Sequence, residues 1–118
     1  MQGPVNHKSM EFSFKAIEVY NRLQSKNEVI MSKQFLASAT SIGANIREAT
    51  AAASRKDFIN KMTIASKEAR EAKYWLELIN HSQLVNKDLS ELLNLNDELI
   101  KLLTKIVLTS KNRTIDPK

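Results

Sequence analysis

Seven apolar or small side chains in the middle of the chain follow one another at alternating steps of four and three residues. They are Phe58, Met62, Ala65, Ala69, Ala72, Leu76 and Ile79. Steps of this kind align side chains along one face of an α-helix, whereas a half-buried strand requires steps of two. Because a stripe of about six turns is buried best against other helices, the spacing predicts an all-helical bundle.

Three other segments also repeat apolar residues at helical spacing. They cover about residues 9–24, 29–52 and 86–110. Ser54 or Asp57 begins the central helix, since either side chain can cap the free amides of a first turn. The small residues around Gly43 let a neighbouring helix approach closely. All three connections are short, which favours antiparallel neighbours, so the predicted fold class is all-α, an antiparallel up-down-up-down four-helix bundle.

The 118 residues are enough for one core and one domain. We divide them into a disordered lead-in over 1–9, the bundle over 10–111 and a flexible tail over 112–118. No segment has the ~18 consecutive apolar residues of a membrane-spanning helix. The N-terminus also lacks the apolar core of a signal peptide. We therefore expect a cytoplasmic protein without a membrane partner.

Composition excludes most catalytic centres. The chain has no cysteine and only two histidines, so thiolate zinc sites and cysteine nucleophiles are ruled out. Only Gly43 lies within the body of the chain, which also rules out a glycine-rich phosphate loop. Glu48, Glu68 and Glu71 could offer carboxylates to a metal ion, but a di-metal bundle also needs histidine ligands that this one lacks. We expect no enzymatic activity, no metal and no cofactor.

The formal net charge of +5 is concentrated in residues 33–73, which carry eight basic and four acidic side chains. Within this segment Lys56, Lys67 and Arg70 fall within about 60° of one another on one helix face. A phosphate backbone could follow such a face, although an ordinary solvated surface would carry the same charges. The candidate phosphate contacts are Lys56, Lys67, Arg70 and Lys73, with Arg47 and Arg55 as second choices.

A second stripe of the central helix lies beside the apolar one. Its members are Ile64, Glu68, Glu71, Trp75 and Leu78. The apolar arc is thus wider than one bundle contact needs, so the helix is either nearly surrounded or contacts another subunit. The carboxylates would pair with Arg47, Lys61 or a cation of another subunit, since an unpaired buried charge is costly. Trp75 is expected to pack or to contact another subunit, which leaves Tyr74 as the better candidate for stacking on a nucleobase.

The stretch from Ser38 to Ile79 resembles the bacterial four-helix-bundle family of 23S rRNA intervening-sequence proteins. The family pattern reads S-I-x-x-N-I-x-E, then S-x-x-D-F, then I-A-x-x-E-x-x-E-x-x-Y-W-L. Fifteen positions match it in order: Ser41, Ile42, Asn45, Ile46, Glu48, Ser54, Asp57, Phe58, Ile64, Ala65, Glu68, Glu71, Tyr74, Trp75 and Leu76. Counted more loosely, the resemblance covers about residues 10–111. Ala49 replaces the usual glycine, which favours a helix that continues through this position.

The resemblance implies a four-helix bundle for which no enzymatic activity or cofactor is established. The family is similar to the accessory variability proteins of retroelements, and both groups form rings of five subunits. The retroelement proteins bind nucleic acid and reverse transcriptase through a basic surface. The motif residues assigned to an interface or core are Asn45, Glu48, Asp57, Glu68, Glu71 and Trp75.

From these features we expect a homo-oligomer, a pentamer, that binds structured RNA without catalysing a reaction. Five subunits would multiply the charge to about +25, which favours binding to a polyanion. The alternative is a protein-interaction scaffold, such as an accessory subunit for a reverse transcriptase or a ribosome-associated factor.

Overall fold

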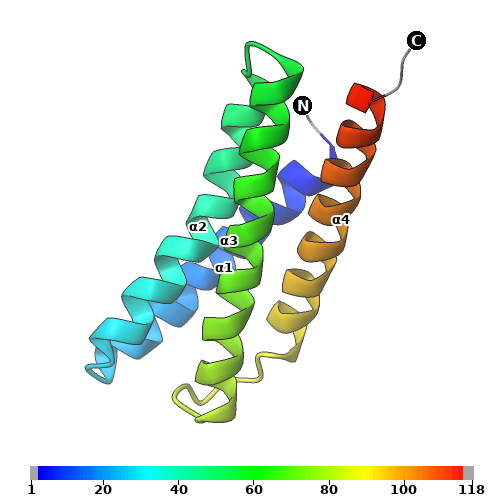
Figure 1. Ribbon diagram of the computed structural model, residues 1–118. Coiled ribbons are helices and arrows are strands. Elements are labelled where there is room, and N and C mark those ends of the chain that lie inside the picture. The colour runs from blue at the N-terminus through cyan, green and yellow to red at the C-terminus, as the bar shows by residue number, and fades with distance from the viewer. Residues whose placement is uncertain (1–2, 116–118) are drawn as a thin grey trace.

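The computed structural model describes residues 3–115 and contains four helices in that range (Figure 1). They are α1 (Pro4–Ser25), α2 (Val29–Thr50), α3 (Arg55–His81) and α4 (Ser90–Ile115). Each helix packs against the next one in the chain, and α4 closes the arrangement against α1. The described residues include no strand. The predicted antiparallel four-helix bundle is confirmed.

Helix α1 begins at Pro4 rather than near residue 9. Gly3 has an extended backbone at the N-cap, and Pro4 occupies the first turn, where a missing amide hydrogen costs nothing. Val5 and Ser9 are both buried, so this first turn packs into the bundle. The prediction of a disordered lead-in is therefore wrong from Pro4 onward, and Met1 and Gln2 lie outside the described residues.

The C-terminal prediction also needs correction, because α4 continues to Ile115 and includes the first residues of the expected tail. Residues 116–118 lie outside the described range. At the start of α3 the hydroxyl of Ser54 accepts a hydrogen bond of 3.0 Å from the amide of Asp57. Ser54 is therefore the N-cap, and Asp57 adds a negative charge to the first turn, where the helix dipole favours it.

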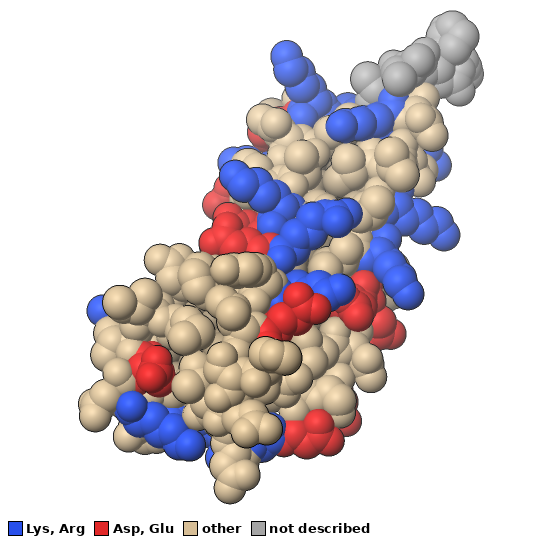
Figure 2. Space-filling model, turned by 60° about the horizontal axis from the view of Figure 1, so that its bottom comes forward, with Lys and Arg blue, Asp and Glu red and all other residues tan. Residues whose placement is uncertain are grey.

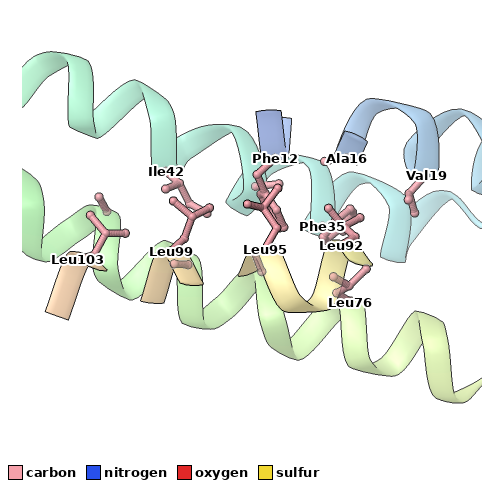
Figure 3. Close-up of a cluster of buried hydrophobic side chains, with 14 of the residues drawn as sticks. Phe12, Ala16, Val19, Phe35, Ile42, Leu76, Leu92, Leu95, Leu99 and Leu103 are labelled. Carbon is pink, nitrogen blue, oxygen red and sulfur yellow. The ribbon is translucent and has the colours of Figure 1, made fainter. Parts of the chain in front are cut away.

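The heptad stripe of α3 lies at the centre of the core. Its residues from Met62 to Ile79 are fully buried, while Phe58 is half-buried at the end of the stripe. Figure 3 shows side chains of all four helices converging there: Phe12, Ala16, Val19, Phe35, Ile42, Leu76, Leu92, Leu95, Leu99 and Leu103. The rings of Phe12 and Phe35 meet edge to face, with 6.2 Å between their centroids. The core thus joins α1 and α2 to α3 and α4, and every residue of the stripe from Met62 to Ile79 belongs to it.

Gly43 marks the close approach of α1 to α2. A Cβ atom at this position would lie 3.4 Å from Oγ of Ser9 and 3.9 Å from Oγ of Ser13. The expectation that small residues around Gly43 admit a neighbouring helix is confirmed. None of the helices within residues 3–115 has the length and apolar character needed to cross a bilayer.

Candidate nucleic-acid interface

Lysine and arginine side chains gather on one half of the bundle, the half that carries the α2–α3 turn and the C-terminal part of α4 (Figure 2). The antiparallel arrangement produces this, because α3 begins in the half where α4 ends. The exposed cations near the end of α4 therefore lie in the same half as the start of α3: Lys105, Lys111 and Arg113. These cations follow residue 73, so they lie outside the basic segment that the sequence indicates. They come near that segment only because α4 packs against α3.

A shallow groove of about 340 Å³ runs between α3 and α4 in this half. Lys67 and Arg70 line it on one side and Thr104 on the other, and Val107 and Leu108 supply its apolar surface. Nη2 of Arg70 donates a hydrogen bond of 3.0 Å to Oγ1 of Thr104, which draws the guanidinium across the groove. No carboxylate lines the groove, and neither cation has an acidic partner within 4 Å in the described part of the chain.

Lys73 is in a different electrostatic situation. Its Nζ lies 2.9 Å from Oδ1 of Asp97 on α4. The hydrogen bond to Asp97 and the charge of that carboxylate raise the pKa of Lys73. An ammonium already paired in this way offers less attraction to a phosphate than the free cations of the groove.

The remaining three predicted contacts do not share one surface. Lys56 is exposed on α3, on the same helix face as Lys67 but about three turns closer to the α2–α3 turn. Arg55 lines a hollow at that turn. Arg47 lines a separate groove between α1 and α2, and α1 is not an adjacent neighbour of α3 in the bundle. The structure therefore groups Lys56 with Lys67 and Arg70, and places Arg47 elsewhere.

The polar motif residues of α2 make two kinds of contact. Glu48 forms an ion pair of 3.0 Å with Lys61 of α3, and that hydrogen bond raises the pKa of Lys61. The side-chain amide of Asn45 instead donates to the carbonyl of Ser41 within α2. Glu48 therefore joins α2 to α3, whereas the amide of Asn45 bonds within its own helix.

Glu68 is half-buried on α3, and Glu71, about one turn later, is exposed. Burial of Glu68, together with the charge of Glu71, raises the pKa of the Glu68 carboxyl, and Lys67 partly opposes this shift. Within residues 3–115 neither glutamate forms an ion pair, so pairing with Arg47 or Lys61 of the same chain is wrong. Nor does any group of three histidine or acidic side chains in that range form a potential metal site.

The two adjacent aromatic residues of α3 differ in exposure. Trp75 is half-buried against the core, as predicted, and its Nε1 is buried without a hydrogen-bond partner among the described residues. Tyr74 is 57% exposed. The two rings meet edge to face with 5.1 Å between their centroids, so Trp75 supports Tyr74 from the side. His81, the last residue of α3, is exposed.

Residues 2–105 match the family model of the 23S rRNA-intervening sequence protein. A crystal structure from Bacteroides thetaiotaomicron, described as a protein of unknown function from the S23 ribosomal protein family, is similar in both sequence and fold. The two are 47% identical with a TM-score of 0.83, over 87% of this chain and 97% of that one. A search of curated proteins finds no match.

Proposed function

This chain belongs to the family of 23S rRNA-intervening sequence proteins, and from this premise we propose that it binds structured RNA through a basic surface on α3 and α4. We call this surface the basic face: Lys56, Lys67 and Arg70 of α3 with Lys111 of α4, which shares the helix face of Thr104. The proposal describes a binding protein rather than an enzyme.

The observation that carries the proposal is the groove formed by Lys67 and Arg70. Both cations lie beside an acid-free groove, and Thr104 orients one of them. Cations free of carboxylate partners can neutralise phosphates and release their counterions, which gives affinity without sequence specificity. Lys73 is a weaker candidate because it is paired with Asp97.

The proposal includes a homo-oligomer, with five subunits as the resemblance implies. A closed ring requires two different surfaces on each subunit. Two unsatisfied features support such contacts. One is the exposed apolar stripe of Met10, Phe14 and Ile17 on α1. The other lies on α3, where two side chains lack partners among the described residues. Nε1 of Trp75 is buried without a hydrogen bond, and Glu68, two turns earlier on the same side of the helix, is half-buried without an ion pair.

The test is a titration of the purified protein with a structured RNA and a matched DNA duplex at several salt concentrations. Binding that falls steeply with salt, with a slope of several phosphates per complex, is the expected result. Native mass spectrometry of the same sample gives the number of subunits. Absence of binding at low salt would overturn the proposal.

A protein-interaction scaffold is the second candidate, and the α1 stripe favours it. Phe14 is 65% exposed and lies between Met10 and Ile17 on the outer face of α1, away from the core. An apolar stripe of this kind suits a protein surface better than a phosphate backbone. If RNA binding fails while Phe14→Ser removes a protein partner, the scaffold is the better description.

A further inference from the structure

A second groove, of about 600 Å³, opens next to Tyr74 on the side away from Lys67 and Arg70. It also lies between α3 and α4, and we call it the Tyr74 groove. Leu78 and Leu93 contribute apolar surface to it, while Asn80 and Asp97 contribute polar groups. An exposed ring beside apolar walls and a few hydrogen-bonding groups is the chemical surrounding that a planar heterocycle needs.

The two grooves differ in charge, so the groove at Lys67 and Arg70 suits a phosphate and the Tyr74 groove suits an uncharged nucleobase. The groove at Lys67 and Arg70 has two cations and no acid in its lining. In the Tyr74 groove the lining includes Glu77, and the ammonium of Lys73 is already offset by Asp97. A phosphate would be repelled there, whereas an uncharged nucleobase would not.

Spacing along α3 connects the two grooves. At 1.5 Å per residue, Arg70 precedes Tyr74 by about 6 Å along the helix axis and Lys67 precedes it by about 10 Å. A stacked strand of B-form geometry advances by ~3.4 Å per nucleotide along its axis, so these axial distances correspond to about two and three nucleotides. A strand whose phosphates contact Lys67 and Arg70 therefore reaches Tyr74 with its next bases.

We propose that Tyr74 is a stacking platform for an unpaired nucleobase, which the Tyr74 groove receives while the adjoining phosphates lie on Lys67 and Arg70. This inference rests on the proposed function and names its ligand more closely: an RNA with a single-stranded segment rather than a continuous duplex. In a duplex both faces of each base are already stacked and its edge is paired, so the ring of Tyr74 has nothing to cover.

The experiment compares two RNAs of equal phosphate number, a hairpin with a single-stranded tail and a fully paired duplex. Fluorescence anisotropy measures both affinities for the wild-type chain, Tyr74→Leu, Tyr74→Phe and the control Ile30→Ala. The control removes another exposed apolar side chain, on α2, that lines neither groove. We expect the tailed RNA to bind roughly 5- to 150-fold more tightly than the duplex, the range that stacking of one base supplies.

Tyr74→Leu should abolish this preference without changing the salt slope, while Tyr74→Phe and Ile30→Ala should keep it. Trp75 provides a second readout, because it is the only tryptophan and its ring lies 5.1 Å from that of Tyr74. Tailed RNA should change its fluorescence and duplex should not.

Three results would overturn the inference. Equal wild-type affinity for both RNAs, or a preference that survives Tyr74→Leu, refutes the platform but leaves phosphate binding at Lys67 and Arg70 intact. A change in subunit number caused by Tyr74→Leu assigns the ring to a subunit contact instead. Absence of binding to either RNA contradicts the proposed function itself.

Discussion

Nζ of Lys73 on α3 lies 2.9 Å from Oδ1 of Asp97 on α4, so the two side chains join neighbouring helices as an ion pair. One turn earlier on α3, Arg70 reaches across to the same neighbour but meets the neutral hydroxyl of Thr104. Two cations that look equivalent in the sequence thus differ in what they can offer an anion, and only Arg70 brings an uncompensated charge.

Replacing Lys67 and Arg70 together by alanine should weaken RNA binding and lower the salt slope by about 2, since each lost phosphate contact removes about one unit. Lys73→Ala should change the slope much less, because its ammonium is already paired with Asp97. Lys33→Ala is the matched control, an exposed lysine near the opposite end of the bundle. Salt titration of the four proteins checks this, and an unchanged slope in the double variant would contradict it.

Much of the fold follows from side-chain periodicity. The stripe from Met62 to Ile79 is buried as its spacing predicts, because helix phase and burial are coupled over many turns. The first turn of α1 was not predictable in the same way. Proline disfavours a helix interior but is favoured in a first turn, so the residue type alone does not say whether α1 begins at Pro4. The helix begins there with Val5 buried in the bundle, which is a tertiary contact.

The candidate site is only partly predictable, because a basic surface depends on which helices are neighbours. Lys67 and Arg70 follow from helix phase alone. Thr104 reaches Arg70 only because α4 packs on α3, and Arg47 lies apart from them because its side of α2 faces α1. The partner of Lys73 is also a tertiary contact, 24 residues distant in the chain. Spacing within one helix carries no such information.

Gly43→Ala should stabilise the protein. Alanine is favoured over glycine within a helix by about 1 kcal/mol. The new Cβ would lie 3.4 Å from Oγ of Ser9, an ordinary contact distance. Thermal unfolding should show a midpoint about 4 °C higher. Gly43→Leu should lower the midpoint, because a larger side chain must displace α1. A lower midpoint for Gly43→Ala would contradict this expectation, because it would mean that even an added methyl group disturbs the packing of α1 on α2.

Asn96→Asp should destabilise the bundle by about 3 kcal/mol or more near neutral pH. Asn96 is fully buried, and its Nδ2 donates a hydrogen bond of 3.0 Å to the carbonyl of Ala69. A carboxylate there would lose the donor, face that carbonyl oxygen and bury a charge without a partner. Urea unfolding measures the loss, and Asn94→Asp, an exposed position on the same helix, is the control. Equal stability of the two variants would contradict the buried role of Asn96.

Glu68→Gln should stabilise the folded chain near neutral pH. Burial and the charge of Glu71 raise the pKa of Glu68 above its usual 4.5. A carboxyl with a raised folded-state pKa is more easily ionised in the unfolded chain, so folding loses stability as pH rises from the unfolded to the folded pKa. Above that range the penalty is fully present, and glutamine removes it.

The advantage of Glu68→Gln should therefore be largest near neutral pH and shrink as the pH falls toward about 3, where the wild-type carboxyl is protonated in both states. Urea unfolding of both proteins at the two pH values measures it, with the exposed Glu11→Gln as control. A glutamine variant that is less stable near neutral pH, and that also loses subunits in native mass spectrometry, would mean that a cation of a neighbouring subunit pairs with Glu68. The carboxylate would then stabilise the assembly at the expense of the isolated chain.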